Sequence, residues 1–414
     1  MSKTVVIGGG PAGLMSAISA ASRGAHVTIL EKGSRPGRKL DITGKGRCNV
    51  TNTADREAFI RAFEPKGRFL YGAFSRFFSE DIIALLESEG VETKVERGGR
   101  VFPVSDRASD VTDALIRHAQ SLGVRIKTNA SAKSLVIEDG AVKGVNLYGG
   151  RFDCAAVVLA TGGVSYPKTG STGDGYEMAK QAGHEIVPPT AALSALFVKN
   201  PIPELAGLSL KNAEVSLIVE GAKKPTRKEF GEMLFTHKGL SGPVILTLSR
   251  SVGRLGGKPA AVSIDLKPAL TPEQLDARLL REFAKPRKMK SVFAALLPKS
   301  LANMFGTLCD VSPEKSTAQV TTAERKRIIE KLKSLTFDIK SLAPVEEAIV
   351  TSGGVALTEI DPKTMGSKLV RGLYFAGEII DIDAETGGYN LQAAFSTGYV
   401  AGNAAADYLS TEDI

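Results

Sequence analysis

The sequence predicts an α/β fold in which a Rossmann-type domain is interrupted by a long insert. A β-α-β pattern with a glycine-rich turn opens the chain. The middle of the chain contains Pro-rich connections, mixed strands and charged helices. After Glu346 the sequence pattern of the first part returns. The length of 414 residues also exceeds that of a usual single domain. We therefore expect a discontinuous domain of residues 1–190 and 346–414, a β-rich insert subdomain at 191–270 and a helical insert subdomain at 271–345.

The opening β-α-β unit has the spacing of a dinucleotide-binding motif. A strand at 4–7 and a second strand at 26–30 flank a helix at 14–22, and the turn between the first strand and the helix contains Gly8, Gly10 and Gly13. Glycines at these positions permit a tight turn, close backbone approach to a pyrophosphate and close helix packing. Glu31 ends the second strand, where a carboxylate can bind a ribose hydroxyl.

The remaining elements of the first domain follow from short apolar runs and turn residues. A polar loop is followed by helical segments near 68–90, a short strand at 100–102 and an amphipathic helix at 105–121. Further strands are expected at 124–128, 132–137, 141–147 and 154–159, with turns at Asp139-Gly140 and Gly149-Gly150. The last of these strands is apolar throughout and ends in a glycine turn, which is typical of a buried parallel strand.

The insert and the C-terminal part have different textures. Mixed strands are expected to about residue 265, and charged helical segments from 271 to about 333. After residue 346 the sequence predicts a strand at 373–376, a long loop and a helix of small residues at about 390–408. This closing helix is expected to belong to the first domain.

The composition excludes several classes of protein. No apolar stretch approaches the roughly 20 residues that cross a bilayer, and the N-terminal strand is broken by glycines, so we expect a cytoplasmic protein without membrane contact. Three cysteines without CxxC spacing indicate neither a disulfide framework nor a zinc site. Four scattered histidines supply no paired ligands, so no metal is expected.

Positive charge is concentrated in the insert. Residues 191–345 contain 25 Lys and Arg against 14 Asp and Glu, a net charge of +11 within a chain whose total is +8. Clusters at 223–228, 285–290 and 324–327 could bind a polyanion. Solvated helix faces and loops that keep the protein soluble are the alternative interpretation.

The C-terminal part distinguishes between the two dinucleotides that the glycine motif could hold, NAD and FAD. A flavin needs a second set of contacts, and Gly377, Glu378 and Asp383 followed by a glycine turn at a helix start supply one. Asp383 could bind ribityl or phosphate-side hydroxyls, and the backbone amides of Tyr389 to Leu391 could stabilise negative charge on a reduced ring. A helix cap without a ligand is the alternative.

Seven segments in order resemble the bacterial flavoproteins called the BaiN-like or YhiN-like family: GGGPAGLMSA, LEKGSRPGRKLDITGKGRCNVTN, GRVFPVSD, ATGGVSYPKTGSTGDGY, LFTHKGLSGP, TSGGV and FAGEIIDIDAETGGYNLQAAFSTG. The resemblance runs from about Val5 to Ala405 and is more diffuse between residues 251 and 341. It implies a glutathione-reductase-type FAD-binding domain with a β and a helical insert. It also implies non-covalent FAD and, in some members, NAD(P)H-driven reduction of a conjugated carbon–carbon double bond.

The loop ITGKGRCNVTN is expected to run beside the cofactor toward its ring. Arg47 could neutralise negative charge, Asn49 could bind ring or substrate, Arg100 could orient an anionic group, and His237 could donate a proton or could be capped or packed. Cys48 could be a reactive thiol or a small packed side chain. The expected catalytic residues are His237, Asn49, Arg47 and Arg100, and the expected cofactor-binding residues are Gly8, Gly10, Pro11, Ala12, Gly13, Glu31, Lys32, Arg38, Lys39, Gly44, Gly46, Arg47, Cys48, Asn49, Thr161, Gly162, Gly377, Glu378, Asp383, Gly388, Tyr389, Asn390 and Leu391.

No second strand-GxGxxG-helix pattern follows Gly13, so NAD(P)H is expected to reach the flavin only transiently as electron donor. The absence of a CxxxxC pair argues against disulfide reduction. We predict an FAD-dependent oxidoreductase that reduces a conjugated C=C bond of a small molecule. Three alternatives stay open: a ribosomal RNA uridine reductase (dihydrouridine synthase) that uses the basic insert, a small-amine oxidase that uses oxygen, and a non-enzymatic RNA-binding protein with structural FAD.

Overall fold

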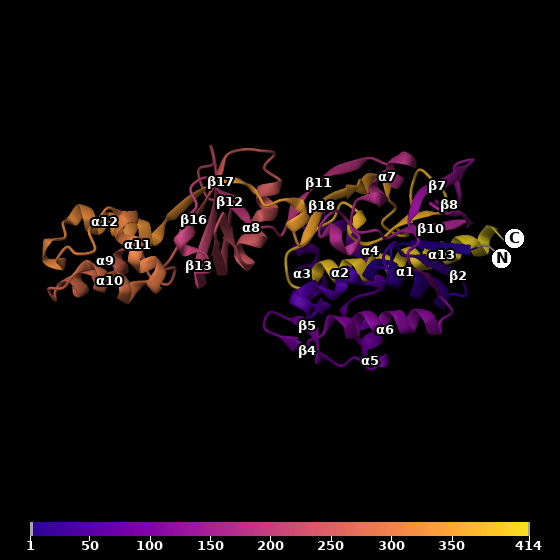
Figure 1. Cartoon of the computed structure of the whole chain (residues 1–414), viewed down its shortest axis with the longest axis horizontal. Coiled ribbons are helices and arrows are strands. Elements are labelled where there is room, and N and C mark those ends of the chain that lie inside the picture. Colours follow the sequence, from indigo (N-terminus) through magenta and orange to yellow (C-terminus); the bar gives the residue numbers. More distant parts are fainter. Residues whose placement is uncertain (1–2, 413–414) are drawn as a thin grey trace. The chain divides into compact units, whose positions relative to one another are not determined.

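The computed structural model describes residues 3–412 and divides the chain into two compact units. The first unit joins Met1–Ala192 to Val345–Ile414, and the second is Leu193–Pro344. The two ends of the chain therefore belong to one unit, and indigo and yellow segments lie side by side in it (Figure 1).

A five-stranded parallel sheet forms the centre of the first unit, in the order β19-β10-β1-β2-β6. Its first strand pairs on both sides, and all residues from Thr4 to Ile7 are buried. β-Branched residues with no exposed face suit such a central position. The strands are β1 (Lys3–Ile7), β2 (His26–Leu30), β6 (Arg125–Lys127), β10 (Ala156–Leu159) and β19 (Leu373–Phe375).

Two helices rich in small residues cross this unit in close contact, α1 (Pro11–Ser22) and α13 (Tyr389–Glu412). A Cβ atom at Gly398 would overlap the carbonyl oxygen of Ala12, and one at Gly402 would overlap the carbonyl oxygen of Ser16. Glycines at these two positions allow the helix backbones to approach closely. This contact fixes the C-terminal helix beside the first β-α-β unit.

Three smaller sheets surround the parallel sheet. They have the orders β3-β5-β4, β7-β8-β9 and β11-β18 and are antiparallel throughout. Their strands are β3 (Thr51–Asn52), β4 (Thr93–Glu96), β5 (Arg100–Pro103), β7 (Ala132–Glu138), β8 (Ala141–Leu147), β9 (Gly150–Asp153), β11 (Ile186–Ala192) and β18 (Val350–Val355). The other α-helices are α2 (Arg38–Asp41), α3 (Arg56–Ala62), α4 (Tyr71–Arg76), α5 (Ser79–Ser88), α6 (Ala108–Ser121) and α7 (Asp174–Gln181).

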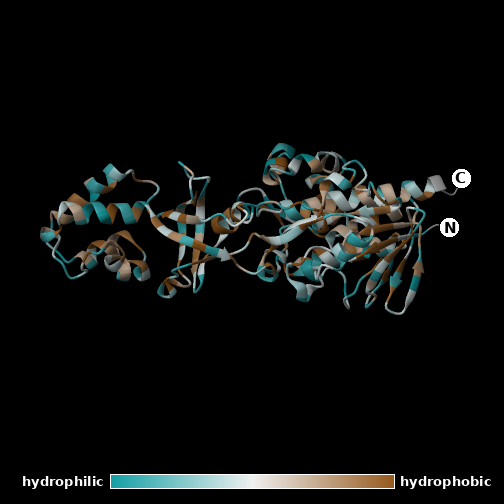
Figure 2. Ribbon diagram, turned by 90° about the horizontal axis from the view of Figure 1, so that it is seen from above, coloured by the Kyte–Doolittle hydropathy of each residue, from teal (hydrophilic) through white to brown (hydrophobic). Residues whose placement is uncertain are grey.

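The second unit contains a closed antiparallel barrel in the order β12-β15-β14-β13-β16-β17. The strands are β12 (Leu196–Val198), β13 (Ser209–Val219), β14 (Arg227–Thr236), β15 (Gly239–Ser241), β16 (Ala260–Asp265) and β17 (Leu335–Leu342), and the helices are α8 (Pro243–Gly253), α9 (Pro272–Phe283), α10 (Met289–Leu296), α11 (Lys299–Cys309) and α12 (Thr322–Lys333). Hydrophilic and hydrophobic residues are mixed along the helices of this unit (Figure 2). Barrel and helices share one apolar core, in which Phe235, Phe293 and Phe305 are buried.

Several sequence predictions of individual elements were wrong at their ends or incomplete. The expected helical region at 68–90 is a 3₁₀ turn (Gly67–Leu70) followed by α4 and α5, because buried Phe77 and Phe78 interrupt the helix with extended backbone. The polar loop after β2 contains α2, a 3₁₀ turn at Thr43–Gly46, β3 and α3. The β-rich part of the insert contains α8, which begins with Pro243 at its first position. Within residues 3–412, no helix is both long and apolar enough to cross a membrane.

Candidate functional site

The glycine turn between β1 and α1 has the backbone geometry that its spacing predicts. Gly8 has a φ of +101°, and a Cβ there would lie 2.5 Å from the carbonyl oxygen of Ala160, directly after the neighbouring strand β10. A Cβ at Gly13 would overlap the carbonyl oxygen of Gly8, whereas a Cβ at Gly10 would meet no atom within 4 Å. The backbone is therefore tightly packed on one side and open at Gly10, where a ligand can approach.

The amino end of α1 is available to an anion. Gly10 caps this helix without a side-chain hydrogen bond, and Pro11 occupies its first turn. The first-turn N–H groups of a helix have no partner within the helix, and they favour phosphate groups. Beside them, the Glu31 carboxylate accepts hydrogen bonds from the backbone N–H groups of Gly9 (2.8 Å) and Gly33 (2.6 Å). This places the predicted ribose ligand next to the predicted phosphate cradle.

Two of the predicted cations after β2 bind the segment before α7. Lys32 Nζ lies 2.7 Å from Asp174 Oδ2 and also contacts the hydroxyl of Thr172, and Arg38 donates to the carbonyl oxygen of Lys168 at 2.8 Å. Thr172 and Asp174 were not among the predicted site residues. Their position beside Lys32 extends the candidate site to residues 168–174.

Lys39 and Glu378 form an ion pair between the N-terminal and C-terminal contact sets. Lys39 Nζ lies 2.6 Å from Glu378 Oε2 and 2.7 Å from Ser165 Oγ. Glu378 Oε1 accepts from the backbone N–H of Thr351 (2.7 Å) and from Ser165 Oγ (3.0 Å). Burial opposes ionisation, but Lys39 and these hydrogen bonds together hold the pKa of Glu378 below its ordinary value. The carboxylate is ionised and fixed in orientation.

A second buried carboxylate cluster follows Glu378 in the chain. Asp381 is buried and pairs with Lys66 Nζ at 2.5 Å, and Asp383 is buried and accepts from Ser352 Oγ at 2.8 Å. Burial raises the pKa of Asp381, because the opposing effect of Lys66 is smaller. These contacts fix the segment that leads from Glu378 to the start of α13.

The loop at residues 43–48 is held in a backbone conformation that few side chains adopt. Gly44 and Gly46 have φ values of +57° and +85°, and Lys45 and Cys48 both have a φ of +60°. Left-handed residues other than glycine are uncommon and concentrate at functional sites. Cys48 is fully buried, and burial raises the pKa of its thiol to about 12. The structure therefore favours the packed side chain over the reactive thiol.

Asn49 connects this loop to the start of α13. With its amide oriented to satisfy its neighbours, Asn49 donates to the carbonyl oxygens of Thr51 (3.0 Å) and Val101 (3.2 Å) and accepts from the Gly388 N–H at 2.9 Å. Thr51 is buried and donates to Gln392 Oε1 at 2.6 Å. Asn49 is thus committed to three backbone groups, and its predicted catalytic role stays a prediction.

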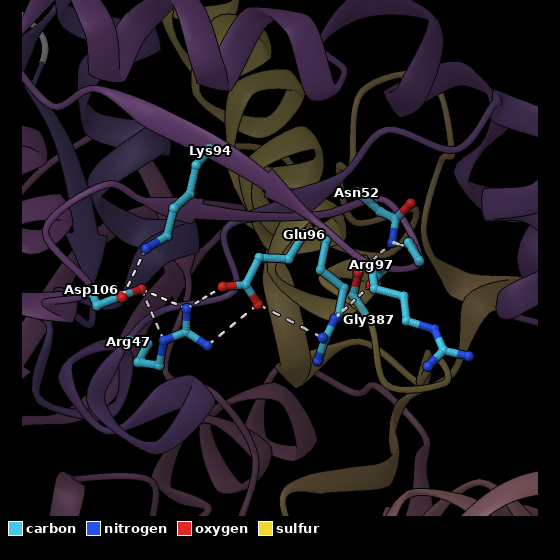
Figure 3. A network of polar contacts seen from close by, with 9 residues as sticks. Arg47, Asn52, Lys94, Glu96, Arg97, Asp106 and Gly387 are labelled. Atoms are coloured by element: carbon cyan, nitrogen blue, oxygen red, sulfur yellow. Dashed lines mark hydrogen bonds and ion pairs between the residues drawn. The ribbon is translucent and has the colours of Figure 1, made fainter.

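Arg47 lies in a network of charged residues on the β3-β5-β4 sheet (Figure 3). Its guanidinium group contacts Glu96 and Asp106 and lies 4.2 Å from the centre of the Phe102 ring. Hydrogen bonds to the two carboxylates raise the pKa of Arg47, and hydrogen bonds from Lys94 and Arg47 lower the pKa of Asp106. Arg47 is engaged by side chains of the protein, and its predicted role toward ligands stays a prediction.

The other two predicted catalytic residues lie in separate units. Arg100 in the first unit donates to the carbonyl oxygen of Arg97 (3.1 Å) and lies 3.7 Å from Glu96. His237 in the second unit is exposed in the turn between β14 and β15. This exposure argues against a core position for the side chain, and the predicted catalytic role of His237 stays a prediction.

The remaining predicted residues lie around the same first unit. Gly377 has a φ of +76° and approaches the side chain of Ala12, and its N–H donates to Thr397 on α13 at 3.0 Å. Asn390 holds the backbone of Ala384 through hydrogen bonds of 2.8 and 3.2 Å. Gly162 has a φ of +73°, and Tyr389 packs edge-on against Phe59 with ring centres 4.7 Å apart.

The chemistry of these residues fits a dinucleotide with a flavin. The hydroxyl oxygen of Thr161 is buried without a hydrogen-bond partner among the described residues. Thr161 follows β10, which lies in the sheet between β1, followed by the glycine turn, and β19, followed by Glu378. The open space at Gly10 and the uncapped amino end of α1 suit the pyrophosphate, and Glu31 suits ribose hydroxyls. The residues that could hold FAD therefore come from both ends of the chain.

Besides Thr172 and Asp174, the site residues that sequence reasoning missed are Ser165, Thr351, Lys66 and Asp381. Ser165 and Thr351 both lie in motifs that were recognised, ATGGVSYPKTG and TSGGV, but their partner Glu378 is distant in the chain. The available signal was a hydroxyl residue two positions from a glycine pair, after Gly163 for Ser165 and before Gly353 for Thr351. Lys66 carried no local signal, because it lies in a loop after α3 without a glycine motif.

The parallel sheet, the glycine turn and the carboxylates at two strand ends define a Rossmann-type FAD-dependent oxidoreductase. Residues 2–404 match the family described as "HI0933-like protein Rossmann domain", and the chain belongs to this family. The family resemblance inferred from the motifs is thus confirmed, as is the α/β fold with an FAD-binding Rossmann domain.

Two relatives cover nearly the whole chain. The chain is 32% identical over 416 residues to a 3-dehydro-bile acid delta(4,6)-reductase of Clostridium scindens, which covers 98% of this chain and 100% of the relative. It is 30% identical over 401 residues to a ribosomal RNA dihydrouridine synthase of Haemophilus influenzae, which covers 96% of this chain and 97% of the relative. The family therefore contains proteins named for two different substrates.

Solved structures share the fold. A 3-ketosteroid-delta4-(5alpha)-dehydrogenase from Rhodococcus jostii RHA1 superposes with a TM-score of 0.52 at 16% identity and covers 98% of this chain and 96% of that one. The open conformation of a flavocytochrome c3 fumarate reductase superposes with a TM-score of 0.51 at 20% identity, covering 98% and 78%. At these low sequence identities, the similarity concerns the fold alone.

Proposed function

We propose that the protein is an NAD(P)H-driven, FAD-dependent reductase of a conjugated carbon–carbon double bond in a small molecule. The observation that carries the proposal is the Lys39–Glu378 ion pair, because it joins the glycine-turn unit to the C-terminal segment in one candidate flavin site. The relative from Clostridium scindens, whose name denotes a reductase of such bonds, supports the reaction type. When bound, FAD would supply the hydride acceptor and donor.

The chain's own residues would position the cofactor and balance its charge. The backbone at Gly10 and the first turn of α1 would hold the pyrophosphate, and Glu31 would bind the adenosine ribose. Glu378, oriented by Lys39 and Thr351, would accept hydrogen bonds from ribityl hydroxyls. The amino end of α13 would favour negative charge on a bound ring, because the first N–H groups and the dipole of a helix favour anions at that end.

We propose His237 as the proton donor to substrate. An imidazole can give a proton near neutral pH, and this side chain is exposed at a tight hairpin turn within one of the family-like motifs, LFTHKGLSGP. Its role would be to protonate the carbon next to the one that receives hydride. The residue acts on substrate and has no part in cofactor binding.

The proposal is tested under anaerobic conditions with the purified holoprotein. NADPH or NADH should bleach the oxidised-flavin absorbance, and a conjugated enone should restore it. His237→Ala should leave the first step unchanged and slow the second. The control His118→Ala, which removes a histidine on α6 that pairs with Glu89, should change neither step. If no enone restores the absorbance, the reaction type is wrong. If His237→Ala is as fast as wild type in the second step, only the proton donor is wrong.

A second candidate function is reduction of a uracil base in ribosomal RNA. The relative from Haemophilus influenzae is named for this activity, and the insert carries a net charge of +11. Ion pairs within the insert reduce the charge available to RNA, since Lys228 pairs with Glu214, and both Lys288 and Lys290 pair with Glu314. The exposed residues Lys223 and Lys224 have no ion pair within residues 193–344. Because this charge is partly neutralised within the insert, we rank the RNA reductase below the small-molecule reductase.

The two functions are separated by one substrate comparison. The NADPH-reduced holoprotein is mixed with ribosomal RNA from cells that lack this chain, so that unmodified bases remain. Return of the oxidised-flavin absorbance, abolished by ribonuclease, would favour the RNA reductase. A steep decline of this rate with added salt is expected for RNA because phosphate contacts release counterions. If enones restore the oxidised-flavin absorbance and RNA does not, the small-molecule reductase is favoured.

A further inference from the structure

The turn between β4 and β5 presents arginines beside the start of α13. Its sequence is ERGGR, from Glu96 to Arg100, and Gly98 and Gly99 have φ values of +79° and +73°. These left-handed glycines close the hairpin tightly and bring its two arginines to one tip. Among the residues that the structure describes, Arg100 is bound by other groups of the protein and the guanidinium group of Arg97 is not.

The acidic residues near this tip are already neutralised. Glu96 contacts Arg47 and Arg100, and Asp106 contacts Arg47 and Lys94. Three cations thus share two carboxylates in the network of Figure 3. Hydrogen bonding to Arg47 holds the pKa of Glu96 below its ordinary value, so this carboxylate is fully ionised and committed near neutral pH. The network leaves no carboxylate for a further arginine.

Arg97 is that further arginine. Its side chain is exposed and extends away from Glu96 and Asp106 (Figure 3). Within residues 3–412, its guanidinium group has no hydrogen bond and no ion pair, and only its backbone carbonyl is used, as the acceptor for Arg100. A free guanidinium group offers a planar fork of donors that matches a phosphate group.

The hairpin tip is rigidly attached to the candidate flavin site. Asn52 Nδ2 donates to the carbonyl oxygens of Gly98 (3.0 Å) and Gly387 (2.9 Å), and the Thr53 N–H donates to the Gly99 carbonyl at 2.8 Å. A Cβ at Gly99 would lie 2.6 Å from Asn52 Oδ1, so the contact requires glycine. Asn52 therefore connects the arginine tip to the turn that precedes α13, whose amino end also favours anions.

We propose that Arg97 binds a phosphate group of the nicotinamide dinucleotide that reduces the flavin, an inference that rests on the proposed function. The chain has one strand-GxGxxG-helix motif, which the flavin would occupy, so a transient dinucleotide has no second glycine-rich turn of this kind for its phosphates. A side-chain cation must replace it. Arg97 is uncommitted, rigidly mounted and adjacent to α13, whereas Arg47 and Arg100 are held by carboxylates.

The test compares wild type with Arg97→Ala, Arg97→Lys and the matched control Arg23→Ala, which removes a surface arginine paired with Asp407 near the C-terminal end of α13. Binding of 2′,5′-ADP and of inorganic pyrophosphate to each FAD-loaded protein is measured by calorimetry. Anaerobic stopped-flow gives the NADPH concentration dependence and the limiting rate of flavin reduction. FAD content and thermal midpoint check that each variant is intact.

Arg97→Ala should weaken binding of the phosphate probes about tenfold and raise the half-saturating NADPH concentration by a similar factor, with an unchanged limiting rate. The affinity of Arg97→Lys for the phosphate probes should lie between those of wild type and Arg97→Ala, because lysine keeps the charge but lacks the planar fork of donors. Equal binding in wild type and Arg97→Ala, or no binding in wild type, overturns the inference. Loss of affinity for single-stranded RNA but not for the phosphate probes also overturns it and assigns the arginine to RNA.

Failure of the proposed function gives a different result. If wild type binds the probes through Arg97 but NADPH does not reduce the flavin, the phosphate site stands and the proposed electron donor is wrong. If NADPH reduces the flavin equally well in all variants, the donor stands and the site is wrong. Binding and reduction are separate measurements, so each result has one interpretation.

Discussion

Lys39 Nζ lies 2.6 Å from Glu378 Oε2, although the two residues are 339 positions apart in the chain. Both side chains are about one-fifth exposed, and Ser165 and Thr351 satisfy the remaining oxygen of the carboxylate. A partly buried carboxylate with a fixed counter-charge keeps its orientation and its negative charge. The pair therefore links the two halves of the discontinuous unit, and in the proposed site its carboxylate would accept hydrogen bonds from cofactor hydroxyls.

Replacing Lys39 by Met should weaken both stability and FAD binding. Without its counter-charge, the pKa of Glu378 rises, and we expect a loss of roughly 2 kcal/mol in the free energy of unfolding, between the effects of surface and buried pairs. Urea unfolding of the FAD-free proteins and fluorescence titration with FAD measure the two effects. Lys180→Met, which breaks the exposed pair with Glu177, is the control and should cost little. Equal behaviour of the two variants would contradict the role of Lys39.

The local parts of the site could be predicted from sequence, and its long-range contacts could not. The turn at Gly8, Gly10 and Gly13 and the acceptor Glu31 lie within one β-α-β unit, so a single spacing specifies their relative positions. The partner of Lys39 depends on the pairing of β10 with β19, which no local pattern encodes. Sequence could indicate that both residues serve a cofactor, but not that they contact each other.

Charge in the sequence also did not reveal which arginine is free. Arg47, Arg97 and Arg100 all lie near recognised motifs, and Arg47 and Arg100 were the predicted ligand contacts. The antiparallel pairing of β4 with β5, together with the turn before α6, places Glu96 and Asp106 beside Arg47. Because these carboxylates come from separate segments, only the folded chain shows that Arg97 lacks a partner among the described residues.

His184 should make the stability of the protein sensitive to mild acid. Its buried ring contacts Glu359 Oε2 (3.0 Å) and Ser367 Oγ (2.8 Å), and burial lowers its pKa despite the nearby carboxylate. A histidine whose folded pKa is depressed takes up a proton more readily when unfolded, so stability present above the unfolded pKa is lost as pH falls through the range between the two values. Wild type should therefore lose stability as the pH falls below the ordinary histidine pKa of about 6.5.

Urea midpoints at several pH values test this dependence. His184→Gln should be less stable than wild type at pH 7.5, by about 1–3 kcal/mol for the disturbed buried hydrogen bonds, and should lose less on acidification. His237→Gln, at an exposed turn, serves as the control and should follow wild type. A His184→Gln curve parallel to that of wild type would show that another group titrates.

Gly402 should be essential for the contact between α1 and α13. A Cβ there would overlap the carbonyl oxygen of Ser16 and the hydroxyl of Ser19, so Gly402→Ala must separate the helices. We expect a destabilisation of about 1–3 kcal/mol in urea unfolding, although alanine is the better helix former. Gly149→Ala is the control, since a Cβ at that turn meets no atom within 4 Å. Stabilisation by Gly402→Ala would mean that the helices are less closely packed.

The three cysteines should be unreactive in the native protein. All are buried, and burial raises the pKa of Cys48 to about 12, of Cys154 to about 12 and of Cys309 to about 11, so almost no thiolate forms at pH 8. A thiol-specific disulfide reagent should react slowly at pH 8 in buffer and rapidly with three thiols in urea.

Cys48 is the decisive case among these thiols because it lies in the loop beside the candidate flavin site. Cys48→Ser should reduce stability, since a hydroxyl replaces a buried thiol, but should leave flavin reduction by NADPH unchanged. Cys154→Ser, in a buried position outside that loop, is the matched control. A single fast-reacting thiol that disappears in Cys48→Ser, together with slower substrate turnover, would restore the redox interpretation of this residue.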